Sequence, residues 1–224
     1  MHANTLYIGL NEAVEEAKES FPDLRVEYVS MEPCGLNAQQ LVGAGKADIA
    51  FETTMSTEMP SATRSMDGFL AILIPEFHGE FVVGVPKGSK LAEKENLVLA
   101  DLAGERFILP ANRSGEIFRR NFIEACRKAG FYPNISLVPM DNAFMFYGSE
   151  PHDAIHLLVR VDRKCKPLIA DLVKQHTVIK SFVDEKRYID SFAVVDPRCE
   201  DPALSRITDF LIERADAFVA GAGR

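Results

Sequence analysis

The sequence predicts an α/β protein built from two halves, and three observations lead to this fold class. Short apolar runs typical of strands alternate with segments whose apolar residues recur every three or four positions, as in amphipathic helices. The segment GVPKGSK (84–90) interrupts this alternation with Pro and Gly. The chain has 224 residues, 47% of them hydrophobic and 26% charged, which allows a buried core in one domain or in two small ones.

The first half begins with strands and helices in alternation. Val14, Ala17 and Phe21 recur with helical spacing after Asn11, whose side chain is typical of a helix N-terminus. The segment 35–45 predicts a second, short helix ended by glycines. The predicted strands around these helices are residues 5–10, 26–31 and 47–52. Because helical connections join parallel strands, we expect a βαβαβ unit with a parallel sheet.

The rest of the chain continues this alternation after a polar stretch, 53–68, whose Ser, Thr, Pro and Gly content predicts a loop. Further strands are expected at 70–74, 80–85, 107–110, 134–138, 154–159, 178–183 and 187–195. An amphipathic helix is expected within 111–130, and Asp201 followed by Pro202 predicts the start of a closing helix. Weaker helical patterns lie at 141–148 and 165–175.

Composition and charge restrict the classes of function. No run of about 18 apolar residues occurs, and the first residues lack the basic and apolar parts of a secretory signal, so we expect a cytoplasmic protein without a membrane segment. The formal net charge of −8 disfavours nucleic-acid binding by this chain alone. The four cysteines have no CxxC spacing, which argues against a zinc ribbon or a disulfide framework.

Catalytic and metal-binding signatures are weak in this sequence. It contains no phosphate-binding loop, no G-x-S-x-G motif and no HExxH motif, so it implies neither an enzyme nor a cofactor. His152, Asp153 and His156 have a spacing that suggests a metal site. A strand there would place His152 and His156 on one face, but metal sites need three or four convergent ligands, so we expect no metal.

Several segments in a fixed order carry a family resemblance. They are FPDLRVEYV (21–29), LVGAGKADIA (41–50), VGVPKGSKLA (83–92), LVLADLAGERFIL (97–109) and KAGFYPNI (128–135). Together they resemble the effector-binding domain of LysR-type transcriptional regulators, and the resemblance spans roughly residues 5 to 219. It departs from the family pattern in its short first helix and in the segment 144–159, which has no G-x-G.

The resemblance implies a type 2 periplasmic-binding-protein-like fold, in which two Rossmann-like subdomains are joined by two crossover strands and bind a ligand in the cleft between them. Subdomain I would hold residues 5–85 and 191–224, and subdomain II residues 86–190. Asp101 would have a structural role at the entry to the strand that follows it. The helix-turn-helix of the full regulators is absent from this sequence, so we expect either an excised domain or a stand-alone relative.

The candidate ligand-binding residues follow predicted strands or precede predicted helices. They are Asn11, Cys34, Gly35, Arg64, Asn112, Arg113, Ser114 and Asn142. Backbone N–H groups and a guanidinium at Asn112, Arg113 and Ser114 suit a carboxylate ligand. Each candidate also has an ordinary structural explanation: Asn11 as a helix cap, for example, and Arg64 as a surface charge in a loop.

The leading hypothesis is a domain that senses a small, anionic effector and transmits its binding to oligomer state and DNA binding. A solute-binding protein of an uptake system has the same fold and is the alternative, and an enzyme on this fold is a third class for which we find no convergent acid, base or nucleophile. The resemblance also implies a homodimer or higher oligomer through helices near 12–20 and 115–129. DNA would be bound only through the absent N-terminal domain.

Overall fold

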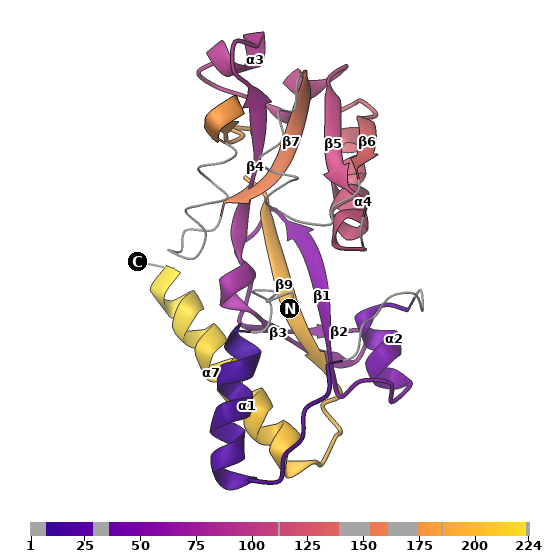
Figure 1. Ribbon diagram of the computed structural model, residues 1–224, viewed down its shortest axis with the longest axis vertical. Helices are drawn as coiled ribbons and strands as arrows, with labels where there is room; N and C mark the ends of the chain where they lie inside the picture. The colour runs from indigo at the N-terminus through magenta and orange to yellow at the C-terminus, as the bar shows by residue number, and fades with distance from the viewer. Residues whose placement is uncertain are drawn as a thin grey trace. The chain divides into compact units, whose positions relative to one another are not determined.

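The computed structural model describes residues 8–28, 36–111, 113–138, 153–160, 174–184 and 186–222 (Figure 1). The chain forms two compact units. Unit 1 comprises Met1–Thr53, Met59–His78 and Asp190–Arg224, and unit 2 comprises Thr54–Glu58 and Gly79–Ile189. Each unit is therefore assembled from segments that are far apart in the sequence.

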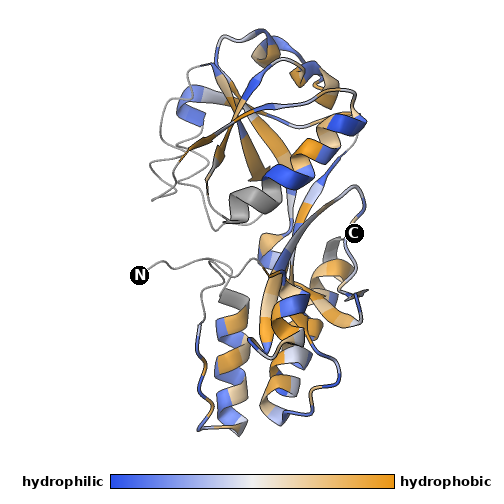
Figure 2. Cartoon of the chain, turned by 90° about the vertical axis from the view of Figure 1, so that its right-hand side faces the viewer, coloured by the Kyte–Doolittle hydropathy of each residue, from blue (hydrophilic) through white to orange (hydrophobic). Residues whose placement is uncertain are grey.

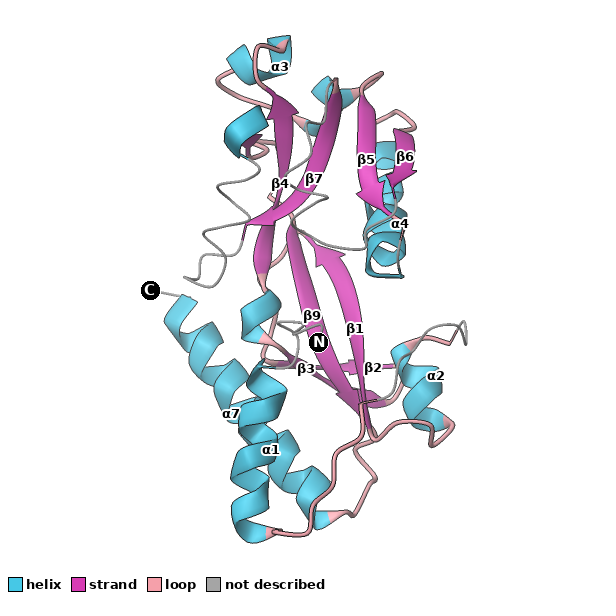
Figure 3. Cartoon of the chain, viewed as in Figure 1, coloured by secondary structure: helices cyan, strands magenta, loops and turns pink. Residues whose placement is uncertain are grey.

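Unit 1 contains an antiparallel sheet with helices packed against it (Figure 3). Strand β9 pairs with both β3 and β1, and β2 pairs with β3. Its strands are β1 (Ile49–Ser56, which ends within unit 2), β2 (Thr63–Met66), β3 (Phe69–Leu73) and most of β9 (Tyr188–Val195). Its helices are α1 (Ile8–Ser20), α2 (Ala38–Gly43), the 3-10 turn η2 (Pro75–Phe77) and α7 (Pro202–Ala222).

Helices α1 and α7 of unit 1 pack against each other through one apolar face each. In α1 the buried residues are Leu10, Ala13, Val14 and Ala17, and in α7 they are Ile207, Leu211 and Ala215. Both sets follow the three-to-four residue spacing of an amphipathic helix, and Figure 2 shows hydrophobic and hydrophilic residues along both helices. Burial of this shared face holds the helical layer on the sheet.

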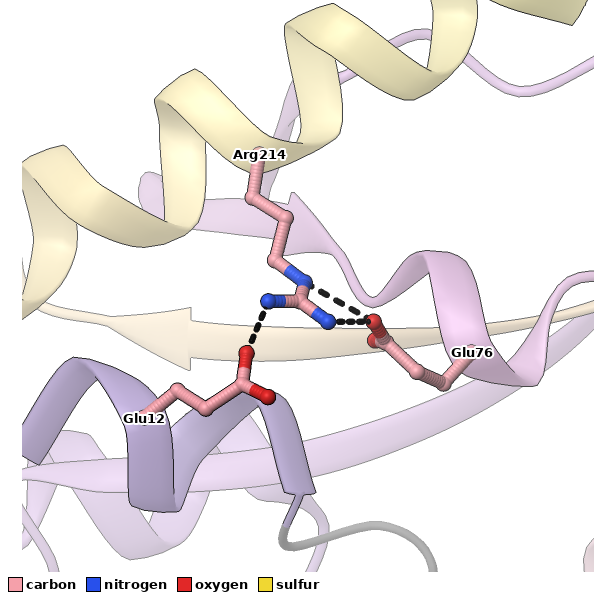
Figure 4. A network of polar contacts seen from close by, with 3 residues as sticks. All are labelled: Glu12, Glu76 and Arg214. Carbon is pink, nitrogen blue, oxygen red and sulfur yellow. Dashed lines mark hydrogen bonds and ion pairs between the residues drawn. The ribbon is translucent and has the colours of Figure 1, made fainter. Parts of the chain in front are cut away.

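An arginine adds a polar contact to this helical layer (Figure 4). The Nε of Arg214 lies 2.8 Å from Oε1 of Glu76, and its Nη1 pairs with Glu12 on α1. Burial alone would lower the pKa of Arg214, but the two glutamates raise it above its usual value. Because the Glu76 side chain is only 9% exposed, this guanidinium compensates a buried carboxylate.

Unit 2 contains a mixed sheet around an aromatic core. Strand β4 is antiparallel to β7 and β8, whereas β5 is parallel to β6 and β7. Its strands are β4 (Gly79–Pro86), β5 (Arg106–Pro110), β6 (Asn134–Val138), β7 (Ala154–Arg160) and β8 (Thr177–Lys180), and its helical elements are α3 (Lys90–Glu93), η3 (Leu99–Leu102) and α4 (Arg113–Lys128). The ring of Phe122 on α4 lies 4.8 Å from that of Phe107 and 5.8 Å from that of Phe81.

The turns of unit 2 explain the Pro/Gly segment and the LADLAG motif. Strand β4 ends at Pro86, and Gly88 takes a φ of 79°, which favours glycine. The Asp101 carboxylate accepts the Val98 N–H at 3.0 Å and pairs with Lys94 at 2.6 Å, which lowers the pKa of Asp101. Asp101 thus caps the turn that leads into β5, as expected from the sequence.

Three secondary-structure predictions for unit 1 are wrong. Residues 8–10 of the first predicted strand belong to α1, because Leu10 continues the helical spacing of its buried face; residues 5–7 lie outside the described part. Residues 26–28 form no strand, and 29–31 are not described. The predicted loop 53–68 contains the end of β1 and all of β2.

The sheet of unit 1 also differs from the parallel arrangement that we expected. The β2–β3 and β3–β9 pairs are antiparallel, and parallel pairing is found among the described strands at β5 with β6 and β7. Asp67 and Gly68 both have positive φ, 53° and 86°, as a two-residue hairpin turn requires. This Asp-Gly pair is a hairpin signal within the stretch predicted as a loop.

The other predicted strands, the helix within 111–130 and the closing helix are confirmed. Asp201 accepts the Leu204 N–H at 2.9 Å, which is the expected cap of α7. The weak helical pattern at 141–148 lies outside the described residues, as does most of 165–175. None of the described helices is both long enough and apolar enough to cross a membrane.

Candidate functional site

Half of the eight predicted ligand-binding residues lie outside the described part of the chain. These are Cys34, Gly35, Asn112 and Asn142. Helix α4 begins at Arg113, so the backbones of Arg113 and Ser114 form its first turn, while their side chains are not described. The structure therefore places two predicted side chains, Asn11 and Arg64, and both belong to unit 1.

Asn11 is not the cap of its helix, because α1 begins three residues earlier, at Ile8. Its side chain is exposed, and its Oδ1 accepts a hydrogen bond from the hydroxyl of Tyr28. The contact fixes the segment after α1 against the helix. Its role as a ligand contact stays a prediction.

Arg64 lies on strand β2 rather than in a loop, and it is not a freely solvated surface charge. Its guanidinium carbon lies 3.9 Å from the centroid of the Phe192 ring, and Nη2 lies 3.8 Å from the sulfur of Met66. Burial lowers the pKa of Arg64, and the carboxylates of Asp190 and Glu52 oppose this shift. Arg64 therefore contributes positive charge to a partly buried acidic environment.

A group of four polar residues in unit 1, which the sequence did not single out, lies where the chain passes between the units. We call Thr53, His78, Asp190 and Ser191 the crossing cluster. Nδ1 of His78 lies 2.7 Å from Oδ1 of Asp190, and the hydroxyls of Thr53 and Ser191 lie 3.1 Å apart. The Asp190 side chain is 1% exposed. The signal in the sequence was the Asp-Ser pair inside the apolar run of β9.

The histidine and aspartate of the weak metal motif in unit 2 have separate environments. His156 on β7 is buried, and its pKa is lowered to about 4. The main cause is burial, and the nearby His176 is a smaller one. Asp153 pairs with Arg106 instead. His152 is not described, and within the described ranges no three His, Cys, Asp or Glu side chains converge as metal ligands would.

The two described cysteines are free thiols in different environments. Cys126 is buried in the unit 2 core, where burial raises its pKa to about 12, whereas Cys199 is exposed. A thiol with so high a pKa is a poor nucleophile at neutral pH. This agrees with the sequence-based interpretation of the cysteines as ordinary thiols.

Comparison with protein families identifies one type of domain. The family model of the LysR substrate binding domain matches residues 9–145. The HTH-type transcriptional regulator ShiR from Corynebacterium glutamicum (strain R) is 39% identical over 57 residues, which cover 25% of this chain. That stretch spans 19% of the relative, so most of the regulator lies outside the match.

Solved structures of other proteins resemble the chain over nearly its whole length, and two of them contain a named effector. The effector binding domain of QuiR in complex with shikimate has a TM-score of 0.56 and 18% identity, with 97% of this chain and 93% of that chain covered. The effector binding domain of BenM with its effector benzoate has a TM-score of 0.58 and 15% identity, with 96% and 89% covered. At these identities the likeness concerns the fold.

Proposed function

Because the chain belongs to the family of LysR substrate binding domains, with a type 2 periplasmic-binding-protein-like fold, we propose that it senses a small anionic metabolite on behalf of a transcriptional regulator. Domains of this family bind effectors and are not enzymes. The family match over residues 9–145 is the observation that carries the proposal. The similarity to a regulator favours sensing over the alternative, solute uptake.

The chemistry of the effector is the first part of this proposal. Shikimate and benzoate, which the QuiR and BenM domains hold, are both carboxylate anions. The first turn of an α-helix has N–H groups without a partner inside the helix, and Arg113 and Ser114 begin α4, a helix of 16 residues. These groups support a carboxylate ligand at this turn, with the guanidinium as a bidentate partner.

The remaining candidates complete the proposed site. We propose that the functional subdomains are 5–85 with 191–224, and 86–190, and that the effector binds between them. Its other contacts would come from the residues predicted on the sequence: Asn11, Cys34, Gly35, Arg64, Asn112 and Asn142. Of these, Arg64 would contact the ligand through the N–H groups at the edge of its guanidinium, while the face of the group stays on the Phe192 ring.

Effector binding would be transmitted through the oligomer in a cytoplasmic regulator whose DNA is bound by a separate helix-turn-helix. The surface charges of two helices support pairing of two copies. Exposed Glu15 and Glu19 make α1 acidic, whereas exposed Arg120 and Arg127 make α4 basic. An α1 helix of one copy beside α4 of another would bring opposite charges together, so pairing should weaken in high salt.

Calorimetric titration with shikimate and with benzoate tests the ligand proposal, with uncharged methyl benzoate as the control. We expect binding of at least one anion and none of the ester, because the carboxylate is the recognised group. A bound anion at about 100 times its Kd would stabilise the fold by about 2.7 kcal/mol. If neither anion binds, the result contradicts an effector that resembles shikimate or benzoate.

Two variants on the same helix test the place of the ligand. Arg113→Ala should weaken anion binding about tenfold or more, because it removes a charge-assisted contact. Lys128→Ala removes an exposed cation at the other end of α4 and should leave binding unchanged. Equal affinities for the wild type and the Arg113 variant would contradict a site at the start of α4.

A further inference from the structure

The crossing cluster occupies a particular position in the chain. Thr53 is the last residue of unit 1 before β1 continues into unit 2, and His78 is the last before β4. Asp190 is the first residue of unit 1 when the chain returns along β9, and Ser191 follows it. Three of the four passages between the units are therefore marked by a polar side chain of the cluster on the unit 1 side.

Side-chain contacts join these three passages to one another. The imidazole of His78 contacts the carboxylate of Asp190 at 2.7 Å, which connects the passage into β4 with the return along β9. The hydroxyl contact of Thr53 with Ser191 connects β1 with the same strand. The His78 ring also lies 5.4 Å from that of Phe218, so α7 packs against the cluster. Strand β9 is the element that the His78–Asp190 and Thr53–Ser191 contacts share.

Backbone pairing continues on either side of the cluster. Within unit 1 the Ile74 N–H donates to the Ser191 carbonyl at 2.8 Å, and within unit 2 the Phe81 N–H donates to the Arg187 carbonyl at 2.8 Å. Gly79 pairs with Ile189 between these bonds. A side chain at Gly79 would approach the Arg160 carbonyl to 2.8 Å, so the backbone is closely packed at this point as well.

The buried charge of Asp190 makes the His78 contact energetically important. An ionised carboxylate that is 1% exposed is costly unless hydrogen bonds and positive charge compensate it. In the tautomer that carries its proton on Nδ1, His78 donates a hydrogen bond to this carboxylate, and Arg64 supplies a favourable charge interaction. The buried carboxylate of Asp190 therefore favours the conformation in which both His78 and Arg64 lie beside it. A contact that strongly favours one conformation acts as a latch, whereas a flexible linker has no such preference.

We propose that the crossing cluster is a conformational latch that holds together the strands at the three passages between the units. With the latch in place, these strands lose and regain their backbone pairing together and do not behave as independent linkers. The latch goes beyond effector sensing, since it concerns how the connecting strands are held and requires no ligand. Its loss should loosen the strands at the passages while the two cores remain intact.

Native-state hydrogen exchange tests the latch in the whole chain without effector. His78→Phe keeps a ring that can pack on Phe218 but removes the donor to Asp190, whereas His78→Asn retains a donor in place of Nδ1. In the Phe variant we expect the amides of Ile74 and Phe81 to exchange about tenfold faster or more, because local opening becomes easier. The Asn variant should restore most of the protection.

The matched controls separate a local latch from general stabilisation. The amides of Lys46, bonded to the Leu41 carbonyl in unit 1, and of Val183, bonded to the Leu97 carbonyl in unit 2, should keep their rates in the Phe variant. Asp196→Asn, which removes an exposed pair with Arg198, should change none of the four amides. Acceleration of all four by one factor in the Phe variant, or of none, overturns the proposal.

A milder variant keeps the proposal testable if the histidine variants fold poorly. Thr53→Val preserves the shape of the side chain and removes the hydroxyl that contacts Ser191. The latch predicts a smaller acceleration, about threefold, again at Ile74 and Phe81 and not at Lys46 or Val183. Protection unchanged at all four sites would contradict a part for Thr53 in the latch. Since no effector is present, these outcomes are independent of whether the ligand proposal holds.

Discussion

The two units are stabilised by different means. The largest side chains buried in unit 2 are phenylalanines whose rings contact one another, with Phe81, Phe107, Phe122 and Phe182 at the centre. Apart from Phe192, the buried core of unit 1 consists of aliphatic residues, and the unit also contains shielded carboxylates that are paired with Arg214, Arg64 and His78. An apolar core depends on the volume and shape of its side chains, whereas a buried ion pair destabilises the fold strongly when one partner is removed. Mutations should therefore affect the units in different ways.

The largest effect is expected from an aromatic deletion in unit 2. Phe122→Ala removes a fully buried ring that contacts Phe81 and Phe107, and it should lower the free energy of unfolding by about 3–5 kcal/mol. Denaturant unfolding measures this loss. Tyr132→Ala, at a ring that is 74% exposed, should cost about 0.5 kcal/mol or less. Equal losses in the two variants would mean that the ring cluster does not organise this core.

The next effect concerns a charge in unit 1. Arg214→Met keeps much of the apolar stem but leaves Glu76 without its guanidinium, and we expect a loss of about 2–3 kcal/mol in the free energy of unfolding. Arg206→Met removes a more exposed pair with Glu16 on the same two helices and should cost about 0.5 kcal/mol. A cost as small for Arg214 as for Arg206 would show that burial of Glu76 does not matter for stability.

A smaller, pH-dependent effect belongs to unit 2. The pKa of His156 is about 4 in the folded chain and near 6.5 in the unfolded chain, so between these values the unfolded chain binds a proton that the folded chain does not. Stability should consequently fall as the pH drops from 6.5 towards 4, and this histidine should account for about 2 kcal/mol between pH 7 and pH 5. Urea unfolding of the wild type and of His156→Leu at the two pH values isolates this contribution.

A second histidine serves as the control for that measurement. His176 is the lesser cause of the shift at His156, so His176→Gln should retain most of the pH dependence. The His156→Leu variant should instead lose about 2 kcal/mol less than the wild type between pH 7 and pH 5. The same dependence in all three proteins would assign the acid sensitivity to other groups.

Local patterns in the sequence were sufficient for most of unit 2 and insufficient for the start of unit 1. Runs such as that of β4 have the length and β-branched content of buried strands, and α4 and α7 have clear apolar faces. The run at 5–10 was ambiguous, because Leu10 fits both a short strand and the buried face of α1. Strand β2 was missed since three of its four residues are polar and its pairing depends on the turn at Asp67 and Gly68.

The crossing cluster illustrates what a single sequence does not reveal. His78 and Asp190 are 112 positions apart, and Thr53 and Ser191 are 138 apart, so no local spacing connects them. An aspartate and a serine inside an apolar strand were the visible sign, because a buried polar group needs a partner. The identity of that partner depends on strand pairing, which only the folded chain specifies. For the proposed ligand contacts, the sequence supplied residue types at element ends but no geometry.

Because β9 pairs with β3 and β1, unit 1 can complete its folding only late in translation. Residues 8–78 make up most of unit 1, yet the strand that fills the middle of their sheet and the helix that covers α1 are translated only with residues 188–222. Residues 79–189, in contrast, contain nearly all of unit 2 and leave the ribosome as a continuous stretch. Domains usually fold in the order of their synthesis, but here residues 8–78 cannot complete their sheet until residues 188–222 have been translated.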